Sequence, residues 1–505
     1  MGSGAVRQRP NVLLITTGQM RRDHMGCWGN TRVRTPNLDD LAAEGILLDR
    51  AYVSNPLSTP NRATIATGRL PSNHRAWCNG ISLDPSEGTI ANVLGEHGYE
   101  TALLGKGHLT PLAAPSDMPG PNFDSRAAWK DGTITSDWTG PYYGFAHCQL
   151  SLGHGMEMLS LGHYGAWMDA NFPGLADRVR RSTSPSPTGA MQCFTPDLPV
   201  SAHVSTWLAR AGEKYLRSRA DDERPFFCWV SFPDPHHPFC PPRPYDTLHD
   251  PRDVAMPACG AEALGDKPPH FRRARRGGEP WEGISPDHRL DELTGEQLRE
   301  IIARTYGMIS LVDESVGAIL AALRETRLDR NTIVIFTSDH GDLMGDCGLL
   351  FKGPFHLEGL IGVPMIWRMP GGPAGLRSSG LFNSCDIAPT ILELLGIDAP
   401  TAMDGLAQAD LLRDGRSKRD AAFVEFKSMY HEELNLRTII TANRKLTWYP
   451  SSDVGELYDM TAETPEAINR WHDPAFANDR HGLQRRLLDE LILRQDDRTQ
   501  PICHT

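Results

Sequence analysis

The chain has 505 residues, of which 40% are hydrophobic and 23% are charged, the composition of an ordinary globular protein. Its net charge of −12 argues against a general nucleic-acid or acidic-membrane surface, so we expect neither partner. No run approaches the ~20 apolar residues that a membrane-spanning helix needs. The length favours one large domain with a smaller one.

In chain order, short apolar strand candidates alternate with helical patterns. Strands are expected at 12–17, 101–105, 226–232, 332–337 and 363–367, and helices at 38–44, 63–67, 90–97 and 297–323. Thr294 and Gln297 are spaced as a capping box at the start of the last helix. The alternation predicts an α/β fold with a doubly wound, mainly parallel sheet.

Three polar segments directly follow predicted strands: Gly18-Gln19, Lys106 and Asp339-His340. In open α/β sheets the chemistry lies beyond the carboxyl ends of the strands. We therefore expect these three segments to converge at one edge of the sheet. The irregular stretches 111–200 and 241–290 are interpreted as walls of a substrate pocket. The dense basic run at 272–276 is expected to be a solvated loop.

The distribution of cysteines and the first residues of the chain bear on the expected cellular location. Ten cysteines are scattered without Cys-x-x-Cys pairs, and no basic segment followed by an apolar stretch opens the chain. We expect reduced thiols in a cytoplasmic protein.

The segment 58–69 carries the strongest functional signal. It reads Ser-Thr-Pro-Asn-Arg-Ala-Thr-Ile-Ala-Thr-Gly-Arg, with Pro60 in what looks like a first helical turn. Ser58 would then lie beside free backbone N–H groups at the positive end of a helix, which suits an anion. Arg62 adds a fork-shaped cation that fits sulfate or phosphate oxygens.

Other motifs accompany this segment in a fixed order. They are Arg22-Asp-His-Met-Gly26, Thr35-Pro-Asn-Leu-Asp39, Leu104-Gly-Lys-Gly-His108, Asp234-Pro-His-His-Pro-Phe239, Thr337-Ser-Asp-His-Gly-Asp342 and Lys352-Gly-Pro-Phe355. Together, from about residue 10 to about 470, they resemble sulfatases and the related phosphonate monoester hydrolases of the alkaline phosphatase superfamily. The resemblance implies an alkaline-phosphatase-like catalytic domain at 1–400, with insertions near 111–200 and 241–290. It also implies a small C-terminal antiparallel α+β domain at 401–505.

The resemblance further implies one divalent cation, with ligands after the first strand and in the late Ser-Asp-His block. Asp339 and His340 match the late pair, and the oxygen of Ser58 and the amide of Gln19 complete the expected set. Oxygen ligands suit Ca²⁺, Mg²⁺ or Mn²⁺, whereas a histidine favours Mn²⁺ or Zn²⁺. The family has Asp where this chain has Gly18, so we expect the cation to bind weakly, if at all.

The nucleophile also departs from the commoner pattern. The family usually has Cys at the position of Ser58, although some members carry Ser, and a maturase oxidises either residue to formylglycine. An unmodified Ser58 would need strong activation to attack as an alkoxide. Two further departures are Cys347, where the family often has His, and Gly362, where Arg is common.

The remaining site residues receive roles in ester cleavage. Lys106 and Lys352 would stabilise the oxygens of the transferred group. His236 would protonate the leaving oxygen, and His108 would orient or deprotonate the nucleophile. Asn79 resembles a substrate-contacting residue of the phosphonate hydrolase branch, and Gln19 is assigned to the substrate as well as to the cation.

The expected function is a sulfatase-type hydrolase that cleaves a small anionic sulfate monoester from residue 58. One alternative is a phosphonate monoester hydrolase or phosphodiesterase of the same fold, favoured slightly by Gln19 and His340. The other is an inactive or altered homologue, natural or engineered, because Gly18 replaces a ligand. A maturase acting on Ser58 would be a partner, and homo-oligomerisation is left open.

Overall fold

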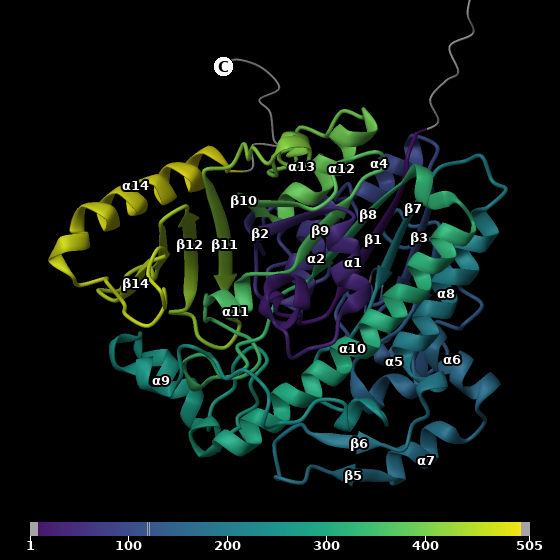
Figure 1. The fold of residues 1–505 in the computed structure, drawn as a ribbon, viewed down its shortest axis with the longest axis horizontal. Coiled ribbons are helices and arrows are strands. Elements are labelled where there is room, and N and C mark those ends of the chain that lie inside the picture. The colour runs from purple at the N-terminus through teal and green to yellow at the C-terminus, as the bar shows by residue number, and fades with distance from the viewer. Residues whose placement is uncertain (1–8, 119, 121, 496–505) are drawn as a thin grey trace, which may run out of the picture.

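The fold is built on a central eight-stranded sheet (Figure 1). The computed structural model describes residues 9–118, 120 and 122–495. The strand order is β10-β2-β9-β8-β1-β7-β3-β4, and β9 alone runs antiparallel to its neighbours. The strands are β1 (Asn11–Thr17), β2 (Ile46–Tyr52), β3 (Glu100–Gly105), β4 (His147–Leu150), β7 (Phe226–Ser231), β8 (Thr332–Ser338), β9 (Met365–Arg368) and β10 (Leu376–Asn383).

The register of the parallel strands brings their carboxyl ends together. Thr17 of β1 lies opposite Ser338 of β8, and Gly105 of β3 lies opposite Ser231 of β7. The four strands β1, β3, β7 and β8 therefore end at the same edge. The segments that follow them must meet there.

Helices cover both faces of the sheet. All residues of β1 are buried although alternate residues face opposite sides, so neither face is open to solvent there. Leu13 and Ile15 belong to one core cluster with α1, α8 and α10, whereas Val12 and Leu14 belong to a second cluster with α2, α4 and α12. The main-domain helices are α1 (Pro36–Ala43), α2 (Ser58–Thr67), α3 (Pro71–His74), α4 (Ile90–Glu96), α5 (Arg126–Lys130), α6 (Gly162–Asn171), α7 (Leu175–Arg181), α8 (Val204–Arg219), α9 (Pro269–Arg276), α10 (Gly295–Glu325), α11 (Glu358–Ile361), α12 (Ile387–Leu395) and α13 (Ala409–Asp414).

A second, four-stranded antiparallel sheet lies beside the β10–β2 edge (Figure 1). Its strands are β11 (Ala421–Lys427), β12 (Asn435–Thr441), β13 (Arg444–Trp448) and β14 (Gly455–Asp459), and α14 (Ala477–Leu493) packs on it. The backbone N–H of Glu425 in β11 donates to the carbonyl of Ser54, which joins this sheet to the segment just before α2. The expected fold class is confirmed. The division at residue 400 stays a prediction, and residues 1–8 and 496–505 of the two expected domains lie outside the described residues.

Most predicted elements match the structure to within a few residues, and the capping box of Thr294 and Gln297 is present at the start of α10. Two expectations were wrong. The basic run at 272–276 lies within helix α9 rather than in a loop, where Arg273 pairs with Glu279 and Glu433. The stretch 111–200 contains α5, α6, α7, β4 and the short hairpin β5 (Thr183–Pro185) and β6 (Phe194–Pro196). The many glycines and aromatic residues of this stretch weaken the helical and strand periodicity, so the sequence did not indicate these short elements.

One described helix, α10, is long and apolar enough by composition to cross a membrane, although the sequence offered no obvious span. Most of it is buried inside the protein, where it packs against α8 and α1. We therefore read α10 as a core helix.

Candidate active site

The site begins at the N-terminus of α2, where Ser58 is the first helical residue. Leu57 precedes it in an extended conformation and provides no side-chain cap, so the first-turn N–H groups have no partner within the helix. One of these, the N–H of Thr59, donates to Oδ1 of Asn79 at 3.0 Å. Asn79 therefore lies beside the expected nucleophile and orients the turn that carries it.

Arg62 lies one turn further along α2 and is completely buried. Its Nε donates to Oδ2 of Asp339 at 2.9 Å, and its Nη1 donates to the carbonyl of Lys106 and to Oγ of Ser231. Nη2 has no hydrogen-bond partner among the described residues. Arg62 thus ties α2 to the ends of β3, β7 and β8.

Asp339 is a carboxylate at the centre of this cluster and is also completely buried. Its Oδ1 accepts from the backbone N–H of Gln19 at 2.9 Å, and its Oδ2 lies 3.6 Å from Nζ of Lys106. Burial alone would raise the pKa of Asp339, but the cations around it, Arg62 and Lys106 among them, hold that pKa well below its usual value. Asp339 is therefore an anion that is already paired.

Ser58 contacts two groups that can act on its hydroxyl. Its Oγ lies 3.1 Å from Nε2 of His340 and 3.3 Å from Nζ of Lys106, which donates to it. Nδ1 of His340 lies 2.7 Å from the carbonyl of Gly341, which can only accept, so Nδ1 carries the proton and Nε2 is the acceptor. Burial lowers the pKa of His340 to about 3, which keeps the ring neutral near pH 7.

Lys352 faces Ser58 from the other side of the cluster. Its Nζ donates to Oε1 of Gln19 at 3.0 Å and lies 2.8 Å from Nε2 of His236 and 3.3 Å from Nε2 of His340. Nδ1 of His236 lies 2.6 Å from the carbonyl of His237, so Nε2 of His236 is an acceptor as well. Burial lowers the pKa of Lys352 to about 8.

His108 lies close to Lys106 and Arg62, but it makes no hydrogen bond to Ser58 among the described residues. Its backbone N–H donates to Asp124, and its Nδ1 is buried without a partner among the described residues. Burial, followed by the charges of Lys106 and Arg62, holds the pKa of His108 well below its usual value. An orienting role for His108 stays a prediction.

His154 is a neighbour of the site that sequence reasoning missed. Its ring stacks on that of His236 with centroids 3.6 Å apart and an interplanar angle of 4°. It belongs to the stretch 111–200, which was expected to line a pocket, but a single histidine in such a stretch carries no signal of its own. Only the packing identifies it.

The expected cation ligands come together, yet they do not fit a divalent cation. The ammonium of Lys352 already occupies the acceptors of Gln19 and His340, and Asp339 is paired with Arg62. Ca²⁺ and Mg²⁺ prefer six or more oxygen ligands, several of them anionic or water. Within the described ranges no group of three His, Cys, Asp or Glu side chains could hold a metal ion. Two lysines and a buried arginine surround Ser58, an arrangement that suits an anion better than a cation.

Gly18 offers no side-chain ligand, and close packing around it also favours glycine at this position. A Cβ atom at this position would lie 2.5 Å from the carbonyl oxygen of Pro233 and 3.6 Å from Nζ of Lys106. A side chain can enter only if the Pro233 carbonyl moves. The segment after β1 is therefore fitted to glycine, and a carboxylate there would also contact Lys106.

Substitution of Gly18 should separate these two effects. Gly18→Ala should lower the stability by about 1–3 kcal/mol through overpacking, and Gly18→Asp by a similar amount. Only Gly18→Asp should raise affinity for Mn²⁺ or Ca²⁺, by at least about tenfold (~1.4 kcal/mol), because it adds a hard anionic ligand. Thermal unfolding and calorimetric metal titration of both variants provide the measurement. Equal metal affinity in the two would show that position 18 is not the missing ligand.

Comparison with known proteins shows the same overall fold. The structure resembles a phosphonate monoester hydrolase of Agrobacterium radiobacter with a TM-score of 0.81 and 28% identity, covering 97% of each chain. An arylsulfatase of Clostridium perfringens is 28% identical over 97% of this chain and 96% of its own length. A choline-sulfatase of Rhizobium meliloti is 28% identical over 92% of this chain and 83% of its own.

These similarities define a hydrolase of the alkaline phosphatase superfamily. The sulfatase family model matches residues 10–397, and a model described as the C-terminal part of N-sulphoglucosamine sulphohydrolase matches residues 345–492. The chain belongs to the sulfatase family, whose members hydrolyse sulfuric esters and use a metal ion and formylglycine.

Proposed function

We propose that this protein hydrolyses a small sulfate monoester by attack from residue 58. The observation that supports this most is the position of Ser58 Oγ, at a helix N-terminus and within 3.3 Å of both His340 and Lys106. A nucleophile beside a proton acceptor and a cation is the arrangement that covalent ester cleavage needs. Turnover of 4-nitrophenyl sulfate by the purified protein is the direct test.

The proton of the nucleophile has a defined acceptor. The Ser58 hydroxyl, or one hydroxyl of a formylglycine hydrate, would pass its proton to Nε2 of His340 as its oxygen attacks sulfur. The positive charges of Lys106 and Lys352 would stabilise the charge that develops on the sulfuryl oxygens. Arg62, fixed by Asp339, would hold α2 in place for this step.

The leaving oxygen would receive its proton from the hydrogen-bonded pair of Lys352 and His236. Nε2 of His236 accepts from Lys352, and burial, followed by His154 and Lys352, keeps the pKa of His236 well below its usual value. The neutral ring therefore holds no proton of its own at that nitrogen near pH 7. We propose that Lys352 gives one of its protons to the leaving group, while Nε2 of His236, which accepts from the same ammonium, orients it.

The oxidation state of residue 58 decides which nucleophile acts. We expect protein made in a host with a serine-oxidising maturase to lose two hydrogens at Ser58, because the family uses formylglycine. Mass spectrometry of the peptide spanning residue 58, with an aldehyde-reactive probe, would detect the change. The Ser58→Thr variant is the control that keeps a hydroxyl but cannot give an aldehyde. Full turnover with an unmodified Ser58 would instead favour direct alkoxide attack.

Phosphonate monoester hydrolysis is a second candidate for the same site. Gln19 bonded to Lys352, the late pair of Asp339 and His340, and the likeness to a phosphonate monoester hydrolase support it. Comparing kcat/KM for an aryl sulfate and an aryl phosphonate monoester separates the two. Absence of turnover on both, with retained sulfate binding, would favour a silent homologue.

For the cofactor and partners we propose only what the donor set supports. The donors present do not fit a divalent cation of the Ca²⁺, Mg²⁺, Mn²⁺ or Zn²⁺ group, so we propose no step through one. A small anionic ester is the proposed substrate. The maturase, self-association and cytoplasmic location stay predictions.

A further inference from the structure

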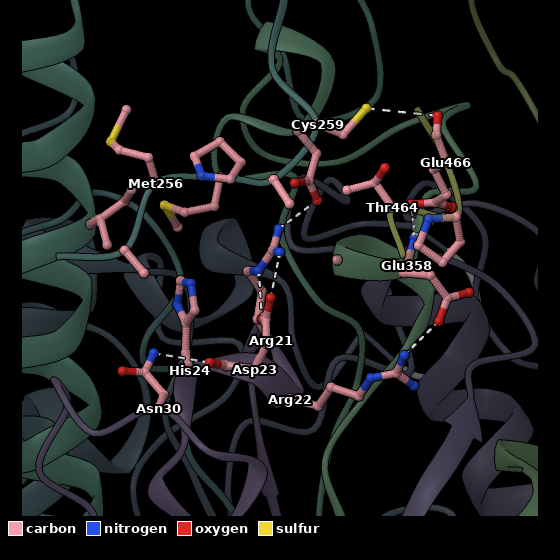
Figure 2. Close-up of a pocket in the computed structure, with 18 of the residues that line it drawn as sticks. Arg21, Arg22, Asp23, His24, Asn30, Met256, Cys259, Glu358, Thr464 and Glu466 are labelled. Carbon is pink, nitrogen blue, oxygen red and sulfur yellow. Dashed lines mark hydrogen bonds and ion pairs between the residues drawn. The ribbon is translucent and has the colours of Figure 1, made fainter. Parts of the chain in front are cut away.

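A pocket separate from the cluster around Ser58 is lined by the segments that follow β1 and precede α9. It has a volume of about 350 Å³ and is bordered by Arg21, His24, Met256, Cys259 and Glu466 (Figure 2). Figure 2 shows the Cys259 side chain at one rim, with its sulfur directed at the backbone of Glu466. The thiol of Cys259 is half-buried and is reached through this pocket.

Behind Cys259 lies a second thiol from a distant part of the chain. Sγ of Cys259 is 3.8 Å from Sγ of Cys347, although the two residues are 88 positions apart. The backbone N–H of Cys347 donates to the carbonyl of Cys259 at 2.7 Å. This bond holds the two backbones side by side at the point where the sulfur atoms meet, so only a small rotation of the side chains is needed to reach the S–S bond length of about 2.05 Å.

The two thiols differ in access. Cys347 is completely buried, whereas Cys259 is partly exposed. The contact with Cys347, followed by the charge of Lys267, lowers the pKa of the Cys259 thiol. Lys267 donates to the same Glu466 carbonyl that accepts from Cys259. A partly exposed thiol beside an ammonium is the one that reacts first.

The backbone at Cys347 also indicates a purpose for its side chain. Cys347 has a φ of 52°, in the left-handed region, between Gly345 and Gly348, which also have positive φ. Glycine would fit this turn with less strain. A side chain kept in such a position is a reason to look for a role.

We propose that Cys259 and Cys347 form a reversible disulfide in the wall of this pocket. The Cys259 thiolate attacks one sulfur of a small disulfide such as oxidised glutathione, forms a mixed disulfide and releases one thiol. The Cys347 thiol then attacks Sγ of Cys259 as it loses its proton, forms the internal S–S bond and releases the second thiol. The two protein thiols are oxidised, the small disulfide is reduced to two thiols, and the protons of the protein thiols pass to the released thiolates.

The bond would link the pocket wall to the turn that precedes Lys352. Asp342 holds this turn by accepting from the backbone N–H groups of Met344 and Phe351. Closing a loop of this length restricts the unfolded chain, so the oxidised protein should melt at a higher temperature than the reduced one.

Peptide mapping tests the proposal directly. Full-length reduced protein is incubated with oxidised glutathione, alkylated and digested with trypsin without reduction. The peptide 253–272 contains only Cys259, and the peptide 331–352 contains only Cys347. We expect most of both peptides to be joined, with a mass two hydrogens below their sum, and to separate on reduction.

Three variants control the result. Cys347→Ser should leave Cys259 as a mixed disulfide with glutathione, whereas Cys259→Ser should leave Cys347 as a free thiol. Cys27→Ser removes another half-buried thiol, which lies beside Asp39, and should leave the linked peptides unchanged. Wild-type protein in which Cys259 is alkylated, remains a mixed disulfide, or is joined to another cysteine would overturn the proposal.

Discussion

Replacing Arg62 by methionine should lower the free energy of unfolding by about 3–5 kcal/mol, because it leaves a buried charge unpaired. Arg62 and Asp339 are both completely buried, and their ion pair is 2.9 Å long. Lys106 alone, 3.6 Å from Asp339, cannot replace the hydrogen bonds that Arg62 makes to three chain segments. Urea unfolding followed by tryptophan fluorescence measures the change.

A surface pair provides the matched control for this variant. Arg217 pairs with Glu325 at the surface, where both side chains are more than half exposed. Arg217→Met should cost less than about 1 kcal/mol. A loss below about 1 kcal/mol for Arg62→Met as well would mean that Asp339 is neutral or solvated, and the charge assignment of the site would be wrong.

Removing the hydroxyl of Ser58 should reduce turnover by at least about 10⁴-fold, since a nucleophile that acts with its base cannot be replaced by neighbours. The variant Ser58→Ala loses the oxygen that contacts His340 and Lys106 but leaves Lys106 and Lys352 in place. It should therefore bind free sulfate within about threefold of the wild type. Ester turnover and calorimetric sulfate titration give the two measurements.

Ser72→Ala is the control for this second variant. Ser72 lies in the first turn of α3, is exposed, and bonds to Glu425 outside the cluster. Its replacement should leave turnover unchanged. Equal activity of Ser58→Ala and Ser72→Ala would exclude residue 58 as the nucleophile.

The sequence determined the sheet and its reactive edge. The apolar runs before Gly18, Lys106 and Asp339 are buried on both sides, and the parallel register brings their ends together. Motif order around Ser58 and Arg62 was enough to indicate the family. These signals are local, because strand length, periodicity and the residues at strand ends are written in neighbouring positions.

The short elements within 111–200 were not readable in this way. Helix α6 contains three aromatic or histidine side chains and two glycines among its residues, so its helical period is weak. The helix is held by packing against the short 3-10 helix before it (Gly155–Ser160) and by contacts with β4 rather than by its own propensity. His154 also lies at the site because of tertiary packing, which places its ring against that of His236.

The charge arrangement at the centre was decided by tertiary structure alone. The sequence indicated that Lys352, His340 and Gln19 lie near Ser58, but not that the lysine ammonium contacts both expected cation ligands. It also could not show that Pro233 fills the space beside Gly18, or that Cys259 meets Cys347. Most of these depend on atoms from segments that are distant in the sequence, such as Gln19 and Lys352 or Cys259 and Cys347, and only the folded packing fixes their distances.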